Sequence, residues 1–127
     1  MEEKKESFVY MVRCEDGSLY TGITKDVGQR MRDHYFKTEK GAKYTKSRRI
    51  QRIMMVWEAE TYRSAARLEY AIKQLPRAKK LQLIEEPKEQ QKRLFPKLAG
   101  ERYVPRREFV MDISDFLEGC SGSGKIC

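Results

Sequence analysis

Five residues in the first part of the chain carry side chains that could act together on a phosphodiester. They are two tyrosines, an arginine, the single histidine and a glutamate: Tyr10, Tyr20, Arg30, His34 and Glu69. A phenol or an imidazole can orient or deprotonate an attacking water, and a guanidinium can grip two phosphate oxygens as charge develops. A carboxylate can hold Mg²⁺, which keeps several waters and accepts phosphate oxygens as ligands. If the fold brings these side chains together, the set predicts metal-assisted hydrolysis of a phosphodiester.

Each of these residues also has an ordinary structural explanation. Two tyrosines can pack as a pair on a sheet, an arginine can be a solvated helix residue, and a single histidine can be a structural residue. Glu69 can form an ion pair with Lys73 four residues later, in the favourable glutamate-first order. A free phenol has a pKa of about 10, so a tyrosine needs positive charge from a metal or from Arg30 to become a base.

The two tyrosines belong to an expected β-hairpin. Residues 8–12 and 19–24 are apolar or β-branched runs, and the Asp-Gly pair between them is a strong turn signal. A one-residue slip reverses the faces of a strand, so the loop length decides where the tyrosines point. A two-residue turn would place Tyr10 and Tyr20 on opposite faces, whereas a three-residue loop with Gly17 in the left-handed conformation would place them on one face. We expect the three-residue loop.

A helix from about Asp26 to Phe36 should follow, with Thr24 or Asp26 as its cap. Apolar residues recur in it at helical spacing and predict a buried stripe: Val27, Met31 and Tyr35. Arg30 and His34 are four residues apart, so they share a neighbouring face of the helix. A hairpin with two phenols, facing a helix with an arginine and a histidine, is a place where a phosphodiester could be held.

The remaining pattern predicts an α+β fold. Residues 50–60 contain a continuous apolar run, which is typical of a buried third strand. A second helix should open at Thr61 or Ser64, and its core-facing residues recur at helical spacing: Ala65, Leu68, Ile72 and Leu75. Leu81 and Ile84 should pack a third helix. The order strand-strand-helix-strand-helix-helix predicts a small three-stranded antiparallel sheet packed against helices.

Residues 8–84 resemble the GIY-YIG endonuclease superfamily. The triplet Phe8-Val9-Tyr10 stands where the first motif would be, and Tyr20-Thr21-Gly22 stands where the second would be. Arg30 and His34 fit the motif helix, and Glu69 fits the metal-binding glutamate. The triplets alone would be a loose match, but their order and spacing with the other three positions make the resemblance specific.

The resemblance is closest to small stand-alone bacterial members, which are similar to the nuclease subunit of eukaryotic structure-specific endonucleases. The loop residues 41–45 also look like that branch. Two departures stand out. The first triplet keeps only its tyrosine, and Ile23 follows the structural Gly22 where nucleotide-excision-repair relatives carry a lysine. The second departure argues against a repair-type role.

This resemblance implies an endonuclease that hydrolyses phosphodiester bonds in DNA, especially branched or otherwise structured DNA. It implies that Tyr10 is the base or the orienter of the attacking water, that Tyr20 helps to position it, and that Glu69 binds Mg²⁺ (or Mn²⁺). Arg30 and His34 complete the expected catalytic set. Because no second carboxylate cluster lies nearby in the sequence, one metal ion fits better than two.

The composition favours a polyanionic partner. The 127 residues carry a formal net charge of +8, with 36% charged and 39% apolar residues, so nucleic acid is the first candidate and an anionic membrane surface the second. There is no run of about 18 apolar residues, and residues 1–6 lack the apolar core of a signal peptide, so we expect no membrane span. Three cysteines without Cys-x-x-Cys spacing favour a reducing cytoplasm over a zinc site.

Nearly all of this charge lies in residues 25–52, which hold ten basic and three acidic residues, a net charge of +7. A charge run is usually a solvated surface, but the interleaved tyrosine, threonine and serine favour contacts to a phosphate backbone with some stacking. The expected nucleic-acid-binding residues are five from this stretch and one helix lysine: Lys43, Tyr44, Thr45, Lys46, Arg48 and Lys73.

The chain divides into an expected nuclease domain, residues 1–86, and a C-terminal extension, residues 87–127. Residues 88–101 are charged and show no clear period. Residues 102–118 contain enough apolar side chains to dock as a strand and a short helix, and this segment could bind a protein partner. Residues 119–127 are small and polar, so we expect a disordered tail.

Two other functions stay open on the sequence alone. One is a non-catalytic nucleic-acid-binding module that has this fold and has lost turnover. The other is an adaptor that docks a partner through residues 102–118, with its charge serving only solubility. Convergence of Tyr10, Tyr20, Arg30 and Glu69 on one site would favour the enzyme.

Overall fold

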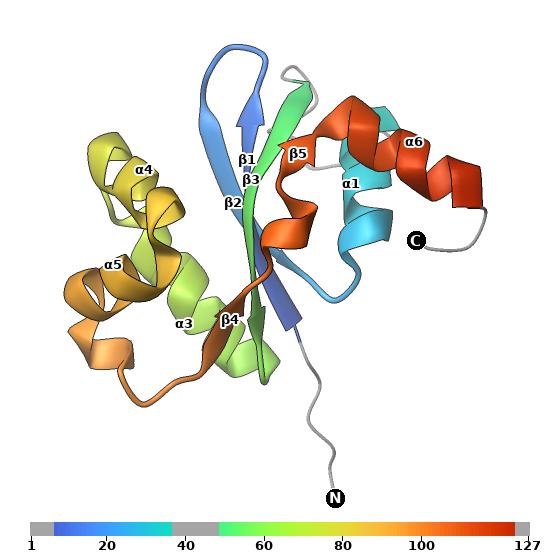
Figure 1. The fold of residues 1–127 in the computed structure, drawn as a ribbon. Coiled ribbons are helices and arrows are strands. Elements are labelled where there is room, and N and C mark those ends of the chain that lie inside the picture. The colour runs from blue at the N-terminus through green and yellow to red at the C-terminus, as the bar shows by residue number, and fades with distance from the viewer. Residues whose placement is uncertain (1–6, 37–48, 124–127) are drawn as a thin grey trace, which may run out of the picture.

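A computed structural model describes residues 7–36 and 49–123 and shows one antiparallel sheet between two layers of helices (Figure 1). The strands are β1 (Ser7–Cys14), β2 (Leu19–Thr24), β3 (Ile50–Ala59), β4 (Tyr103–Pro105) and β5 (Met111–Asp112). Their order is β2-β1-β3-β4, and β5 also pairs with β3. The fold is α+β, as the sequence predicts, and β2 forms one edge of the sheet.

The β1–β2 hairpin has the three-residue loop that places both tyrosines on one face. Tyr10 pairs with Gly22, so Tyr20, two residues before Gly22, faces the same side of the sheet as Tyr10. Residues 15–17 form the loop, which a backbone hydrogen bond of 2.9 Å between its flanking residues closes. Gly17 has a φ of 88°, where a residue without Cβ meets no steric penalty. The predicted register is confirmed.

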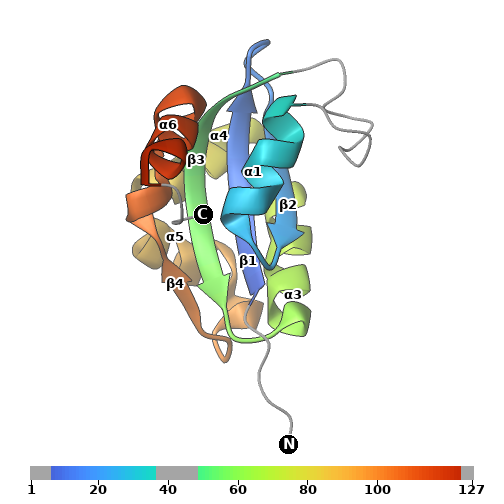
Figure 2. The same ribbon diagram turned by 90° about the vertical axis from the view of Figure 1, so that its right-hand side faces the viewer.

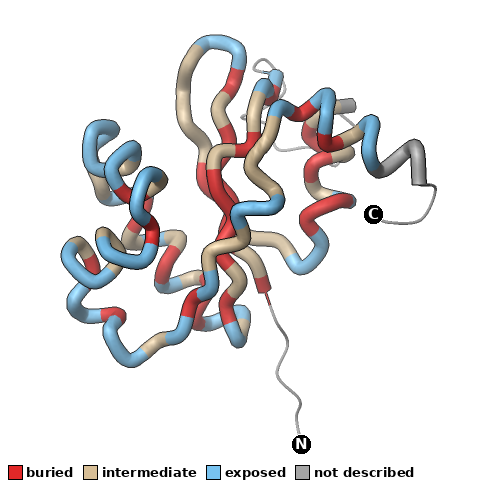
Figure 3. Tube along the Cα trace, in the orientation of Figure 1, coloured by how far each residue is buried: buried red, intermediate tan, exposed pale blue. Residues whose placement is uncertain are grey.

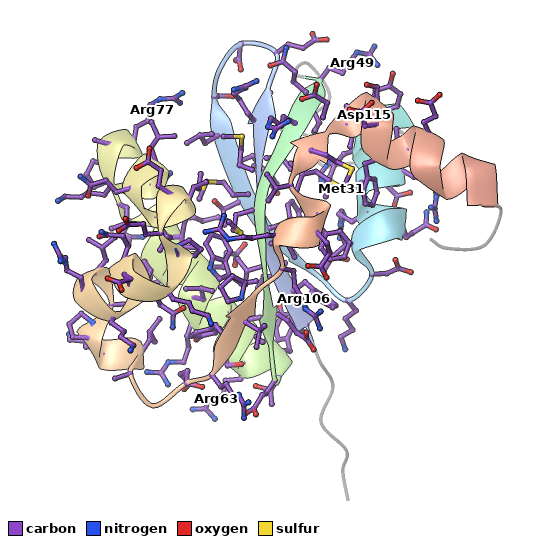
Figure 4. The ribbon with its side chains drawn as sticks, viewed as in Figure 1. Met31, Arg49, Arg63, Arg77, Arg106 and Asp115 are labelled. Atoms are coloured by element: carbon purple, nitrogen blue, oxygen red, sulfur yellow. The ribbon has the colours of Figure 1, made fainter. Side chains whose placement is uncertain are left out.

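Helix α1 (Val27–Phe36) packs on the face of the sheet that carries the tyrosines. Asp26 caps its first turn by accepting the Gln29 N–H at 3.0 Å, as an aspartate at this position commonly does. Val27 and Met31 are buried between the helix and the sheet, and Figure 4 shows Met31. The expected helix and its buried stripe are therefore present, and they hold the next turn, with Arg30 and His34, over the hairpin.

The other face of the sheet is covered by four further segments: α3 (Tyr62–Lys73), α4 (Arg77–Glu85), α5 (Pro87–Leu94) and the 3-10 helix η1 (Pro96–Leu98). Thr61 and Ser64 form a capping box at the start of α3, because each side chain accepts the backbone N–H of the other residue. Buried residues follow the strands and the inner sides of the helices, while the outer sides of α4 and α5 are exposed (Figure 3). Within residues 7–36 and 49–123, no helix is long and apolar enough to cross a membrane.

The C-terminal extension completes the sheet and the core on both faces. β4 and β5 pair with β3 along the edge that β1 leaves open, and η2 (Arg107–Phe109) lies between them. Helix α6 (Ile113–Ser123) lies beside α1 and inserts Ile113 and Phe116 into the core (Figure 2). The docking of this segment as strand and helix was expected, but the sheet has five strands rather than three. An open edge along a strand as long as β3 exposes unpaired N–H and C=O groups, and the extension satisfies them.

Two local expectations for the second half of the chain are wrong. Leu81 is 37% exposed, and Leu83 is the buried residue of α4, because tertiary packing buries a different position from the one that the spacing suggested. Residues 88–101, for which the sequence shows no clear period, include most of α5. The tail was expected to be disordered from residue 119, but α6 continues to Ser123, since a helix that is already nucleated adds one hydrogen bond with each residue. Residues 124–127 lie outside the described residues.

A hydrogen bond joins the extension to α3, and removing it would show how much this contact contributes to stability. The Tyr103 hydroxyl donates to the Ser64 carbonyl at 2.7 Å, and Tyr103 is 8% exposed. Tyr103→Phe should lower the free energy of unfolding in urea by about 1 kcal/mol, because the ring still packs but a buried hydrogen bond is lost. Tyr62→Phe, at a position 56% exposed on the same helix, is the control and should change stability by less than about 0.5 kcal/mol. Equal effects in the two variants would contradict this attachment.

Candidate active site

Tyr10 lies across the backbone of Gly22 in the neighbouring strand. A Cβ atom built on Gly22 would lie 2.5 Å from Tyr10 Oη and 2.7 Å from its Cζ, distances that no real side chain could occupy. The position therefore needs a glycine for close approach rather than for backbone conformation. This contact gives a physical reason for the glycine of the second motif, because it lets the phenol of the first motif cross the neighbouring strand.

The Tyr10 hydroxyl meets the single histidine of the chain. Tyr10 Oη lies 3.0 Å from His34 Nε2, and both residues are almost fully buried, at 2% and 1% exposure. The Tyr20 ring completes the cluster, with its centroid 6.2 Å from that of Tyr10 and 5.8 Å from that of His34. The Tyr10 and His34 rings meet edge to face at 5.9 Å. Two strands and one helix thus hold three aromatic side chains that carry polar atoms.

Burial keeps both members of the hydrogen bond neutral. Burial is the largest influence that raises the pKa of Tyr10 well above 10, and Tyr20 and Glu69 raise it further, while Arg30 opposes them. Burial also lowers the pKa of His34 to about 4, and Arg30 lowers it further while Asp33 opposes. At pH 7 the site therefore holds a phenol and an uncharged imidazole. In this state Tyr10 is a weak base, and any catalytic role requires added positive charge beside it.

Arg30 and Glu69 supply opposite charges to the cluster from the two helical layers. Arg30 lies on α1, one turn before His34, and its charge acts on both Tyr10 and His34. Glu69 lies on α3, which contacts β2 from the other face of the sheet, and its charge reaches the Tyr10 phenol. Glu69 also forms an ion pair with Lys73, with 3.1 Å between Glu69 Oε2 and Lys73 Nζ, and the Glu69 side chain is 24% exposed. The ion pair expected from spacing alone is thus present beside the site.

The structure accordingly brings five expected site residues into one electrostatic neighbourhood. Direct contacts join Tyr10, Tyr20 and His34, while the charge of Arg30 acts on Tyr10 and His34 and that of Glu69 acts on Tyr10. Lys73 lies next to the site through its ion pair with Glu69. The other expected nucleic-acid-binding residues lie outside the described residues: Lys43, Tyr44, Thr45, Lys46 and Arg48.

The described residues include no group of three or more histidine, cysteine, aspartate or glutamate side chains that could hold a metal. Glu69 is the carboxylate whose charge acts on the Tyr10 phenol. A cation held there would depend on waters and substrate oxygens for its other ligands, which is an arrangement that Mg²⁺ accepts. The donor set therefore fits one weakly held hard cation and does not fit zinc.

Arg49 is one charge among many in the basic stretch of the sequence, but the structure gives it specific partners. Its guanidinium lies over the Tyr35 ring, 5.7 Å from the centroid, and donates to the Tyr35 carbonyl at 3.4 Å. It also forms an ion pair with Glu15 of the hairpin loop at 3.8 Å (Figure 4). Arg49 thus ties the end of the basic stretch to α1 and to the hairpin. The long sequence separation of these partners left no signal that could have predicted the contact.

Comparison with known proteins shows the family of the chain. Residues 6–82 match the family model of the GIY-YIG catalytic domain, so the chain belongs to this family. That domain is a nuclease domain, which makes nucleic acid the class of partner. Similar curated proteins include the UPF0213 proteins of Staphylococcus aureus strains Mu50 and COL, each 49% identical over 79 residues, which are 62% of this chain and 94% of theirs.

Among solved structures, the chain is similar to the UPF0213 protein BH0048 from Bacillus halodurans, determined by solution NMR. The two are 38% identical, the match covers 70% of this chain and 96% of the other, and the TM-score is 0.41. The expected kinship with small stand-alone bacterial members of the superfamily is thus confirmed. The family model ends at residue 82, so α5 and the elements after it lie beyond the matched region.

The approach of Tyr10 to Gly22 predicts a specific sensitivity. Gly22→Ala should lower the free energy of unfolding by about 1–3 kcal/mol, because the new methyl group overlaps the phenol and forces the ring away from His34. Gly100→Ala is a matched control, since nothing lies within 4 Å of the added Cβ there. Urea denaturation of both variants measures the difference. A Gly22→Ala variant as stable as Gly100→Ala would show that the Tyr10 ring does not lie across this backbone.

Proposed function

We propose that the chain is a cytoplasmic, Mg²⁺- or Mn²⁺-dependent endonuclease that hydrolyses phosphodiester bonds in DNA, in particular branched or otherwise structured DNA. The observation that carries this proposal is the buried contact between Tyr10 and His34, with Arg30 and Glu69 acting on it from two sides. The preference for structured DNA rests on the resemblance to the nuclease subunit of structure-specific endonucleases.

Arg30 would bind the scissile phosphate, and this binding would change the neighbouring histidine. The positive charge of Arg30 lowers the pKa of His34 in the free protein. A bound phosphate would offset that charge and add its own, so the imidazole would become a better proton acceptor when substrate is present. His34 could then take the proton of the Tyr10 hydroxyl, 3.0 Å away, while Tyr10 activates or orients the attacking water. Tyr20 would help to position that water.

Glu69 would hold the divalent cation. A cation there would stabilise charge on the phosphate oxygens, and its positive charge would reverse the effect by which Glu69 raises the pKa of Tyr10. Lys73 would have to leave Glu69 for the cation to bind, since its Nζ now lies 3.1 Å from the carboxylate. Released from Glu69, Lys73 could pair with a DNA phosphate instead. One ion pair therefore links the proposed metal site to the proposed DNA surface.

The two parts of the chain, residues 1–86 and 87–127, would have different functions. Residues 1–86 would form the nuclease domain, with Lys43, Tyr44, Thr45, Lys46 and Arg48 contacting the DNA backbone. Residues 87–127 would form an extension that braces β3 and carries a protein-binding surface. The anchoring of Arg49 between α1 and the hairpin supports the first of these roles, because it holds the residue that follows Arg48 against α1.

A non-catalytic nucleic-acid-binding module of the same fold is the second candidate. The Glu69–Lys73 ion pair favours it, because that contact already satisfies the carboxylate that would hold the metal. The neutral state of Tyr10 favours it as well, since an uncharged phenol is a weak base. The two candidates make opposite predictions for a nuclease assay on a panel of DNA and RNA structures with and without Mg²⁺ or Mn²⁺.

Glu69→Gln should separate binding from cleavage. The variant keeps the shape of the side chain and loses its charge, so DNA affinity should persist or increase. Cleavage should fall by at least about a hundredfold, because a metal ion supplies several kcal/mol of stabilisation. Loss of the exposed ion pair should cost only about 0.2–0.5 kcal/mol of folding stability. An unfolded variant would mean that Glu69 is a structural partner, and an unchanged cleavage rate would end its assignment as the metal ligand.

Tyr10→Phe should give the same phenotype for a different reason. The ring can still pack over Gly22, but the oxygen that meets His34 is gone. Cleavage should fall by about a hundredfold or more while DNA binding stays within about twofold of wild type. Tyr62→Phe, on the exposed side of α3, is the control and should cut as wild type does. If wild type cuts nothing with either cation while all variants bind DNA alike, the binding-module candidate is correct.

The salt dependence of binding tests the basic stretch. Each neutralised phosphate should contribute about −0.9 to the slope of log affinity against log salt on duplex DNA. Replacing Lys43, Lys46 and Arg48 with alanine should flatten that slope by about two to three units. The control replaces Lys79, Lys88 and Lys92, which are exposed on α4 and α5, and should leave the slope nearly unchanged. If the control flattens the slope and the replacement of Lys43, Lys46 and Arg48 does not, the DNA footprint lies on α4 and α5.

A further inference from the structure

An apolar groove on the outer side of α3 takes no part in the site described above. It has a volume of about 680 Å³ and lies between α3 and the segment formed by the end of α5 and η1. Ala66 and Ala71 of α3 and Leu94 of α5 are among the apolar residues that line it. None of Tyr10, Tyr20, Arg30, His34 or Glu69 belongs to its lining.

The groove depends on the C-terminal extension. One wall comes from Leu94 and the residues of η1, and all of these lie beyond residue 82, where the family match ends. Phe95 and Leu98 of this wall also pack into the core beneath α3, so the wall is firmly held. The groove therefore forms only where the C-terminal extension packs beside α3 of the nuclease domain.

The rim of the groove is basic. Arg63, Arg67 and Lys97 all line it, and Arg63 extends outward from the end of α3 in Figure 4. Arg67 already pairs with Glu101, whereas neither Arg63 nor Lys97 forms an ion pair with a carboxylate in the described part of the chain. The rim thus offers two cations at an apolar opening, and acidic groups are their natural complement.

Tyr70 adds an aromatic side chain to the same rim and is 69% exposed. Tyrosine and arginine are enriched among the residues that dominate protein–protein binding energy, and the buried centre of such interfaces is apolar with a polar rim. Protein–DNA interfaces are more polar and more uniformly basic. An apolar floor with a few cations and a tyrosine at its edge therefore fits a protein better than a nucleic acid.

We propose that this groove binds an amphipathic helix of an acidic partner protein. Large apolar side chains spaced three or four residues apart on one face of that helix fill the groove over Ala66 and Leu94, as in other helix-in-groove complexes. Glutamate or aspartate side chains flanking those anchors meet Arg63 and Lys97. The proposal does not rest on nuclease activity, because the groove and the Tyr10–His34 site share no residue.

The test is a selection from a displayed library of random helical peptides, with the full chain as bait. A parallel selection uses Ala66→Leu, which keeps a good helix former and fills the groove. We expect peptides to be enriched on wild type over Ala66→Leu, with paired apolar anchors and flanking acidic residues. Enrichment that is equal on both baits, or enrichment of basic peptides, would overturn the proposal.

A selected peptide is then labelled, and its affinity is measured by fluorescence anisotropy. Ala66→Leu and Lys97→Glu should each weaken its binding by about tenfold or more. The matched controls Ala78→Leu and Lys79→Glu change exposed residues of α4 in the same way, and each should bind the peptide within about twofold of wild type. A loss of affinity in the controls as large as that in the groove variants would overturn the assignment of the groove. A loss of DNA affinity in Lys97→Glu without loss of peptide binding would show that the groove holds nucleic acid instead.

Discussion

The arrangement of the site depends on the contact between the Tyr10 phenol and the bare backbone of Gly22. Tyr10 belongs to an inner strand, and its ring crosses the edge strand β2 at Gly22 on the way to α1. Any side chain at position 22 would occupy that path. Because Gly22 has no side chain, this path is open, and the Tyr10 hydroxyl lies 3.0 Å from His34 Nε2. The contact also requires that α1 pack with His34 facing the hairpin. The hairpin register, the helix position and the buried hydrogen bond therefore depend on one another.

Burial of Tyr10 and His34 also changes the pKa values on which the proposed chemistry depends. Burial raises the pKa of Tyr10 and lowers that of His34, so the free protein holds the pair in its neutral, unreactive form. Arg30 acts on both residues of the pair, and Glu69, from the opposite helical layer, acts with the opposite sign on Tyr10. Substrate phosphate at Arg30 would make His34 a better proton acceptor, but it would also offset the charge that lowers the pKa of Tyr10. A cation at Glu69 would then be needed to favour release of the Tyr10 proton. A site of this design would be activated by its substrate and metal together.

The sequence predicted the parts of the fold that local rules decide. The left-handed Gly17 settled the hairpin register, and Asp26 and Thr61 marked helix starts that the structure has. The grouping of the candidate site residues followed from motif order, because each of them lies on an element whose type was predictable. The sequence predicted that residues 102–118 dock as a strand and a helix, but it could not reveal that two strands of this segment pair with β3, since the partners lie 44 to 60 positions apart. It also could not reveal the choice of Leu83 over Leu81 as the buried residue of α4. Both depend on tertiary contacts that leave no local period.

The most direct test of the buried neutral pair is an NMR titration of His34, which is the only histidine in the sequence. Its imidazole resonances need no assignment and can be followed from pH 8 down to about pH 4. If His34 is enclosed with Tyr10 beneath α1, its pKa lies far below the ordinary 6.5, at about 4, so the ring stays neutral at pH 5.5 and its Nε2 shift reports a hydrogen bond. An imidazole that titrates with a pKa of about 6.5, as an exposed histidine does, would contradict the account.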